Sequence, residues 1–161
     1  MAIDVLGEQI AALLAEQLHA CLRYRCLLLH CADIPTLSRA CESVIAKAGT
    51  MGKPCVLEHA DQFDEIGAVS CRTVIARIEE VAATQPVILA GPLHYVDYWS
   101  EQVCMGFWRY LAAFMSGPGI IVVDTPRKTV VEGVFRIVGR LPESDICYLK
   151  SRLAATQDGL V

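Results

Sequence analysis

The sequence predicts a single α/β domain, a three-layer sandwich in which a mostly parallel sheet of five or six strands lies between two layers of helices. Residues 120–123 form an unbroken run of four β-branched residues, which suits a strand buried on both faces of a covered sheet. Polar residues follow this run directly, and the same succession of apolar strand and polar end occurs three times upstream. Segments with apolar residues at helical spacing separate these strands, as in right-handed strand–helix–strand units.

The first part of the chain is expected to contain two helices and one strand. Apolar residues recur at helical spacing over residues 4–22, and this helix would pack its apolar face either against its own sheet or against a partner protein. A short apolar run predicts the first strand at residues 26–29. The next apolar stripe predicts a helix over residues 34–48, with Gly49 as its C-terminal cap.

The middle of the chain continues this alternation. Strands are expected at residues 55–57 and 86–90. A helix between them is expected to start near Ser70, because a serine hydroxyl can bond the free backbone amides of a first helical turn. Residues 95–115 are rich in aromatic side chains and are expected to be helical for most of their length.

The last part of the chain is expected to form one edge of the sheet. The sequence Gly117-Pro118-Gly119 turns the backbone into the β-branched run. Two further strands are expected at residues 134–138 and 146–149, and because no helix separates them this edge would be antiparallel. The tail from about residue 154 is expected to be frayed, and no linker or repeat divides residues 1–161 into further domains.

The composition limits the classes of function. Hydrophobic residues make up 54% of the chain and charged residues 20%, as expected for a covered parallel sheet or for a subunit with an apolar docking surface. The net charge of -4 argues against a nucleic-acid-binding surface across the whole domain. No apolar run is long enough for a membrane helix and no secretion signal is recognisable, so we expect a cytoplasmic protein without membrane contact. The eight cysteines form no C-x-x-C pair, which favours packed thiols and predicts neither a metal site nor a cofactor.

Polar side chains that could carry chemistry lie just past four of the expected strands. They are His30, Cys31 and Asp33, then Glu58, His59 and Asp61, then His94 and Asp97, and finally Asp124, Thr125 and Arg127. The carboxyl ends of parallel strands meet at one edge, where open α/β sheets bind ligands. One interpretation is therefore a small metal-dependent or His/Cys-based hydrolase, with His30, Cys31, His59, His94 and Asp124 as candidate catalytic residues. The alternative is that loops leaving a sheet are polar in any case, with Cys31 as a packed thiol.

Two further groups of side chains are candidates for binding. The aromatic residues Tyr95, Tyr98, Trp99 and Trp108 could, if exposed, stack a nucleic-acid base or anchor a partner protein. The alternative is that they fill the core above the sheet. Arg127 and Arg136, together with Lys128 and Arg140, form a modest basic group that could contact phosphate, as in a nucleic-acid-binding module.

The layout also carries a resemblance to a known family. Ile88-Leu89-Ala90-Gly91 stand where a Walker B strand lies, and Val122-Val123-Asp124-Thr125 stand where a sensor strand ends. In this order of elements the chain resembles the core of P-loop NTPases of the AAA+ or RecA type, and it is similar to the small P-loop component of bacterial phage-exclusion (BREX) cassettes. The phosphate-binding loop G-x-x-x-x-G-K-[ST] is missing, because residues 30–36 read HCADIPT, and the Walker B position lacks a terminal acid. The resemblance implies a P-loop-like or Rossmann-like fold without nucleotide hydrolysis.

These observations together predict a non-catalytic, P-loop-like subunit, in effect a pseudo-ATPase. It would bind other proteins, or further copies of itself, in a cytosolic assembly, through its aromatic segment and its N-terminal helix. The resemblance implies prokaryotic anti-phage defence or DNA processing as the setting, with nucleic acid reached through the assembly. The enzyme and the nucleic-acid-binding module described above remain the alternatives.

Overall fold

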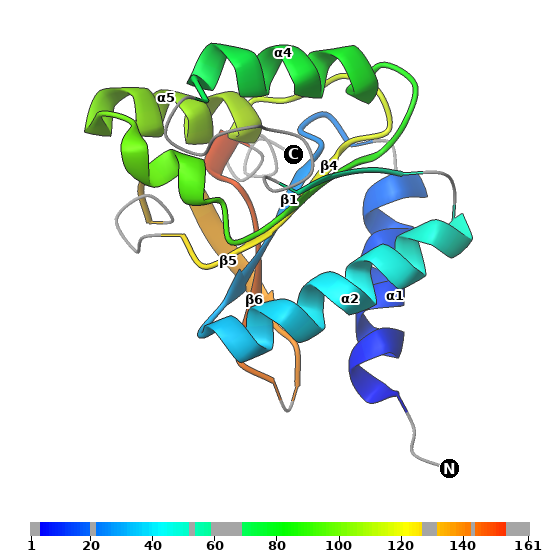
Figure 1. The fold of residues 1–161 in the computed structure, drawn as a ribbon. Helices are drawn as coiled ribbons and strands as arrows, with labels where there is room; N and C mark the ends of the chain where they lie inside the picture. The colour runs from blue at the N-terminus through cyan, green and yellow to red at the C-terminus, as the bar shows by residue number, and fades with distance from the viewer. Residues whose placement is uncertain are drawn as a thin grey trace.

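A six-stranded sheet with helices on both faces organises the molecule (Figure 1). The computed structural model describes residues 4–19, 22–51, 54–58, 69–126, 132–142 and 144–153. Within these ranges no helix combines the length and the apolar character that a membrane span requires. The predicted α/β class and its three layers are confirmed.

The strands form one mixed sheet. In chain order they are β1 (Cys26–Cys31), β2 (Cys55–Glu58), β3 (Val87–Ala90), β4 (Ile120–Asp124), β5 (Phe135–Arg140) and β6 (Ile146–Ser151). Their order across the sheet is β2-β3-β4-β1-β6-β5. The strands β2, β3, β4 and β1 pair in parallel with their neighbours, whereas β6 is antiparallel to both β1 and β5.

The prediction of a mostly parallel sheet is therefore wrong, because two of the five strand pairs are antiparallel. The physical reason is the short connection between β5 and β6, since a parallel pair needs a crossover of about a dozen residues or more. The expected antiparallel edge is confirmed. No sequence pattern predicted that β6 would pair with β1, the pairing that joins the antiparallel edge to the parallel strands.

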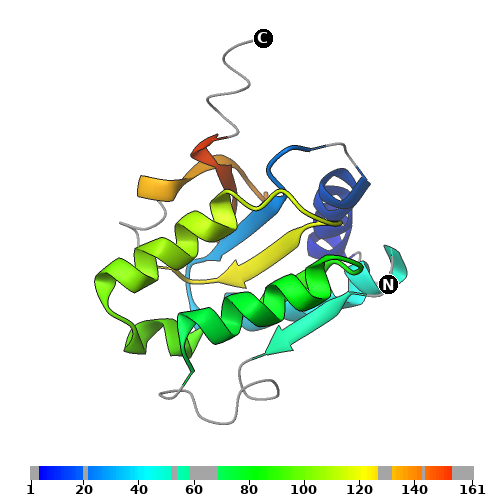
Figure 2. The ribbon, with the colours of Figure 1, turned by 90° about the horizontal axis from the view of Figure 1, so that it is seen from above.

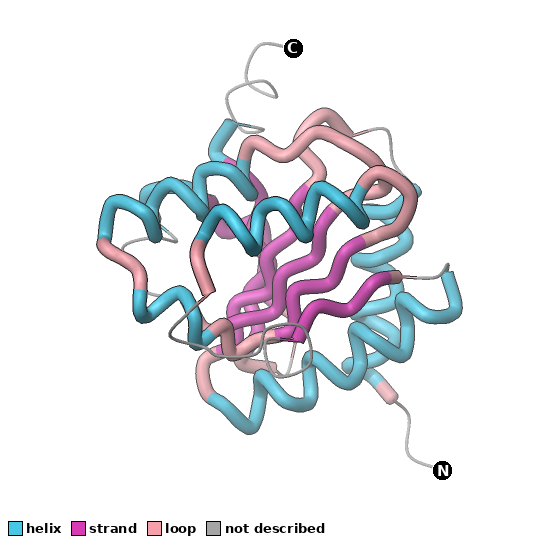
Figure 3. The backbone as a smooth tube through the Cα atoms, turned by 45° about the horizontal axis from the view of Figure 1, so that its top comes forward, coloured by secondary structure: helices cyan, strands magenta, loops and turns pink. Residues whose placement is uncertain are grey.

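The helices lie in two layers. They are α1 (Val5–His19), α2 (Ile34–Met51), α4 (Cys71–Ala82), the 3-10 helix η2 (His94–Tyr98) and α5 (Glu101–Ala112). α1 and α2 cover one face of the sheet, and α4, η2 and α5 cover the other (Figures 2 and 3). The chain crosses from β1 through α2 to the distant β2 and then returns through β3 to β4, so right-handed crossovers place the helices on opposite faces.

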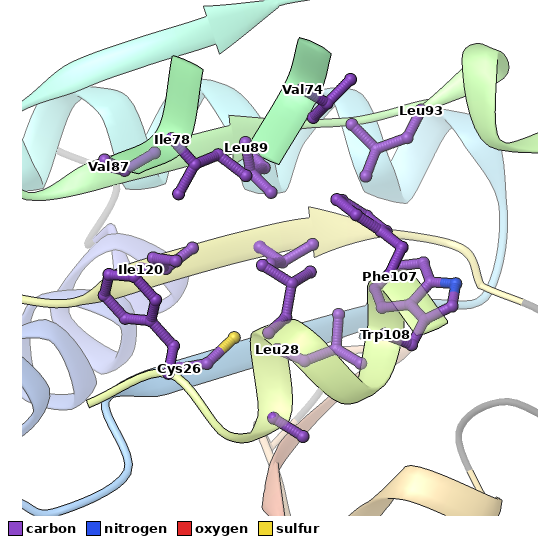
Figure 4. Close-up of a cluster of buried hydrophobic side chains, with 14 of the residues drawn as sticks. Cys26, Leu28, Val74, Ile78, Val87, Leu89, Leu93, Phe107, Trp108 and Ile120 are labelled. Atoms are coloured by element: carbon purple, nitrogen blue, oxygen red, sulfur yellow. The ribbon is translucent and has the colours of Figure 1, made fainter. Parts of the chain in front are cut away.

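The core lies on both sides of the central strands. On β1, Cys26 and Leu28 belong to the cluster under α4 and α5, while Leu27 and Leu29 belong to the cluster under α1 and α2. Figure 4 shows the first cluster, in which strand residues Leu28, Val87, Leu89 and Ile120 face Val74 and Ile78 of α4 and Phe107 and Trp108 of α5. A strand buried in this way has no polar alternation, as the sequence of β4 predicted.

The N-terminal helix uses its apolar face inside the domain. Ile10 and Leu14 of α1 are fully buried in the second cluster, and α1 packs along α2. The interpretation that this helix packs on its own sheet is confirmed. The docking interpretation stays a prediction, because the burial of Ile10 and Leu14 reports only on contacts inside the domain, and Val5 of the same helix is 42% exposed.

Two predicted helix boundaries change. The helix expected over residues 95–115 is divided into η2 and α5, because Ser100 caps α5 by accepting a hydrogen bond from the Val103 N–H at 3.2 Å. Gly49, the expected cap of α2, lies inside that helix, which continues to Met51. The predicted turn before β4 is confirmed, with φ of 61° at Gly117 and 122° at Gly119.

Replacing Phe107 by alanine tests the packing of α5 on the sheet. Phe107 is fully buried, with its ring centroid 5.2 Å from that of Trp99 and 5.6 Å from that of Trp108. We expect Phe107→Ala to lower the free energy of unfolding by about 3–5 kcal/mol in urea denaturation, because a cavity replaces the ring. The exposed neighbour Gln102 supplies the control, and Gln102→Ala should change it by less than about 0.5 kcal/mol. Equal effects of the two substitutions would contradict this packing.

Candidate functional site

A pocket of about 350 Å³ opens at the carboxyl edge of the parallel strands. Its walls come from Ile34 at the start of α2, from the segment after β3, from the residues after β4, and from α5. The connection after β1 leads to α2 on one face, whereas the connection after β3 leads to η2 and α5 on the other. Such a divergence leaves the crevice in which open α/β sheets bind ligands. This pocket is therefore the candidate functional site.

Asp124, the last residue of β4, lies in the wall of this pocket and is only 6% exposed. Burial raises its pKa above the usual range of a carboxyl group, and the nearby Asp97 acts in the same direction. The backbone N–H groups of Thr125 and Leu93 oppose this rise, as does His94, and the Leu93 N–H lies 3.4 Å from Oδ1. A buried carboxyl with a raised pKa in a cleft is a common feature of functional sites.

Gly91 allows β3 and the carboxylate of Asp124 to approach one another. A Cβ at position 91 would lie 2.5 Å from the carbonyl oxygen of Val123 and 2.6 Å from Oδ1 of Asp124. The Gly91 N–H also donates to that carbonyl at 2.7 Å. Glycine is therefore required at the end of β3 to keep Asp124 in its position.

Of the five candidate catalytic residues, His94 and Asp124 line the pocket, whereas His30 and Cys31 lie at the end of β1 and are not part of its wall. Strand pairing aligns His30 of β1 with Asp124 of β4. His94 is close enough to Asp124 to lower the pKa of its carboxyl group. Asp124 in turn is close enough to Cys31 to raise the pKa of its thiol. The fifth candidate, His59, lies outside the described residues, as do Asp61 and the side chain of Glu58.

Cys31 is unsuited to nucleophilic chemistry in this position. It is fully buried, and burial, with smaller contributions from Cys41, Asp124 and Asp33, raises the pKa of its thiol to about 12. A reactive cysteine needs a lowered pKa and access to substrate, so the packed-thiol interpretation fits better. Among the described side chains, no three His, Cys, Asp or Glu residues lie close enough together to hold a metal ion.

The helix end after β1 is occupied by the chain's own carboxylate. Oδ1 of Asp33 accepts a hydrogen bond from the Thr36 N–H at 2.8 Å and so caps α2. Hydrogen bonds from the side chain and backbone of Thr36, with a smaller effect of Arg39, lower the pKa of Asp33. In a P-loop protein the corresponding helix N-terminus holds phosphate. Here Asp33 already supplies an anion at that place.

The candidate aromatic residues fall into two groups. Tyr95 and Trp108 are 1% and 2% exposed, so they fill the core above the sheet, as the alternative interpretation expected. Trp99 is half-buried, with its indole N–H donating to the Val69 carbonyl at 2.8 Å, and Tyr98 is 67% exposed. Trp99 and Trp108 both line the pocket, whereas Tyr98 lies in η2 between two lining residues, Asp97 and Trp99.

Two members of the expected basic group, Arg136 and Arg140, lie within the described residues. Arg136 and Arg140 lie on β5, which is separated from the pocket strands by β6 and is not part of the pocket wall. Arg140 is paired with Asp145 at 3.0 Å. Arg127 and Lys128 lie outside the described ranges.

Comparison with known proteins gave no match: no family model, no curated protein and no solved structure is significantly similar to the chain. The basis for a function is therefore the pocket itself. Sequence reasoning missed the contribution of α5, which adds Glu101 and Met105 to the wall. It also missed the cap at Asp33, although an aspartate directly before Ile34-Pro35 is a helix-start signal.

Substitutions at Asp33 test its role as a cap. Because its pKa is lowered in the folded state, the stabilisation is complete above the unfolded pKa of about 3.9 and is lost as the pH falls through the folded pKa. We expect Asp33→Ala to lower the melting temperature at pH 7. Asp33→Asn keeps the cap without titrating, so it should stay near the wild type at pH 7 and lose less stability in acid. An unchanged melting temperature in Asp33→Ala would contradict the cap.

Asp124 should show the opposite dependence on pH. Its pKa is raised by folding, so the ionised form is disfavoured in the folded state and stability is lost as the pH rises from the unfolded pKa through the folded pKa. We expect Asp124→Asn to raise the melting temperature at pH 7, and this difference should shrink as the pH falls towards 4. Glu42→Gln, on the exposed side of α2, is the control and should show neither effect. A less stable Asp124→Asn at pH 7 would refute this assignment.

Proposed function

We propose that this chain is a non-catalytic subunit with a P-loop-like fold that binds another protein at the pocket at the carboxyl edge of its parallel strands. The observation that carries the proposal is a pocket with apolar side chains in its wall, one of which, Ile34, is among the most exposed apolar side chains described. Of the large apolar side chains described, the three most exposed are those of Tyr98 at 67%, Ile137 at 63% and Ile34 at 56%. Ile34 lines the pocket, and Tyr98 lies between two residues that line it.

The pocket has the character of an anchor site. Trp99, Trp108 and Met105 give it apolar walls, and its volume of about 350 Å³ is at the small end of ligand sites. Protein interfaces concentrate binding energy where a buried aromatic or long side chain fills such a pocket and where apolar rim residues exclude water. Ile34 lines the pocket and can form part of that rim, and we infer the same of Tyr98 from its place between Asp97 and Trp99.

Two features support a P-loop-like subunit without nucleotide hydrolysis. In Rossmann-like and flavodoxin-like sheets β2 lies beside β1, whereas here β3 and β4 separate the two, which favours the P-loop-like alternative. The carboxylate of Asp33 at the start of α2 would repel a phosphate there. The setting in prokaryotic defence or DNA processing rests on the resemblance in layout alone.

Native mass spectrometry of the tagged protein from its own host tests the proposal. We expect a second protein in fixed ratio with the wild type, and its loss from the double variant Ile34→Asp, Tyr98→Asp, because charges on the rim oppose apolar docking. Ile137→Asp is the matched control, since Ile137 is equally exposed but lies on β5 away from the pocket. A lone wild-type chain would refute the proposal. Loss of the partner from Ile137→Asp alone would move the interface to β5.

A further inference from the structure

An imidazole stands between a carboxyl group and a thiol in one row across the middle of the sheet. Strand pairing places His30 of β1 opposite Asp124 of β4 on one side and opposite Cys147 of β6 on the other. Directly paired residues of neighbouring strands point to the same face, and in an antiparallel pair their Cβ atoms are about 4.5–5.5 Å apart. The imidazole of His30 and the thiol of Cys147 are therefore neighbours, at the edge where β1 and β4 end.

All three side chains lie on the face of the sheet that α4 and α5 cover. Leu28 and Val122, two positions before His30 and Asp124, belong to the core cluster under these helices, and Cys147 packs against the same cluster. His30 and Cys147 are half-buried, whereas Asp124 is buried. The thiol and the imidazole are thus partly open to solvent, and the carboxyl group on the far side of the imidazole is not.

This order of groups suits a nucleophilic thiol. A neighbouring imidazole makes a cysteine a better nucleophile by accepting its proton as the sulfur attacks. A carboxyl group on the other side of the imidazole holds the ring in place and favours the protonated ring that results. Among the described side chains, none of these three is hydrogen-bonded to another at rest, and such bonds often tighten only in the reacting complex.

We propose that Cys147 is a site of reversible modification by small disulfides such as glutathione disulfide, with His30 as the proton acceptor. The Sγ atom of Cys147 attacks one sulfur of the reagent, its S–H proton passes to His30, and the S–S bond of the reagent breaks. The departing glutathione thiolate takes up that proton, so one mixed disulfide and one free thiol are formed and the reagent itself is the oxidant. This modification goes beyond the proposed function and does not require the partner protein.

The rate at which each cysteine is modified tests the proposal. The reduced, folded chain is mixed with glutathione disulfide at pH 7, quenched with N-ethylmaleimide, and analysed by peptide mass spectrometry. Cys71 is the internal control, because it is also half-buried and burial, with a smaller contribution from Cys104, raises the pKa of its thiol. We expect Cys147 to react about tenfold faster than Cys71, and about tenfold faster than Cys147 itself in the chain unfolded in urea, where His30 is no longer held beside it.

His30→Gln should lower the rate at Cys147 about tenfold and leave the rate at Cys71 unchanged, because it removes the proton acceptor. Dithiothreitol should restore the unmodified chain. Reaction of Cys147 no faster in the folded than in the unfolded wild type would overturn the proposal, whether or not His30→Gln folds. So would an unchanged rate at Cys147 in a folded His30→Gln variant, or faster reaction at Cys71. A chain that binds its partner but is not modified overturns this inference alone, and a chain that is modified but has no partner overturns the proposed function alone.

Discussion

Burial of β4 on both faces is the constraint on which the rest of the structure depends. All five of its residues are buried, and it pairs in parallel with β1 on one side and β3 on the other. A strand of this kind needs helices over both of its faces. The chain runs from β1 to the distant β2 and then back through β3 to β4, and because the connections are right-handed this change of direction puts helices on both faces. The ends of three neighbouring strands therefore meet where the two helix layers diverge, and Asp124 is buried there because it continues β4.

Local patterns in the sequence were sufficient to predict most elements, and long-range placement was not predictable. The β-branched run of β4 and the apolar stripes of α1, α2 and α4 are local signals, and each element lies close to where it was expected. The position of β6 beside β1 depends on pairing between residues more than 100 positions apart, as in Leu28 with Leu149, and no local pattern encodes it. The break between η2 and α5 had a local signal, Ser100, which the surrounding aromatic residues obscured.

Only those residues of the candidate site that end or follow a strand could be predicted from the sequence. Parallel pairing explains why His30, Cys31, His94 and Asp124 lie at one edge of the sheet, since each follows or ends a strand of the same parallel set. Glu101, Met105 and Trp108 could not be predicted as wall residues, because their place depends on how α5 lies across the sheet. Local sequence also could not predict which aromatic residues are exposed. Tyr95 is buried and Tyr98 is exposed, although they are one helical turn apart.

The burial of an acidic residue at the end of an otherwise apolar strand disfavours the ionised form of its carboxyl group. Burial raises the pKa of Asp124, and the N–H groups of Leu93 and Thr125 compensate only in part for lost hydration. A group of a partner that donated a further hydrogen bond to this carboxylate would favour its ionised form and so recover part of this loss. Partner binding and domain stability would then be coupled through one carboxyl group, and the complex would be more stable than the free chain. Local conflicts of this kind are expected where a fold has been adapted to bind something.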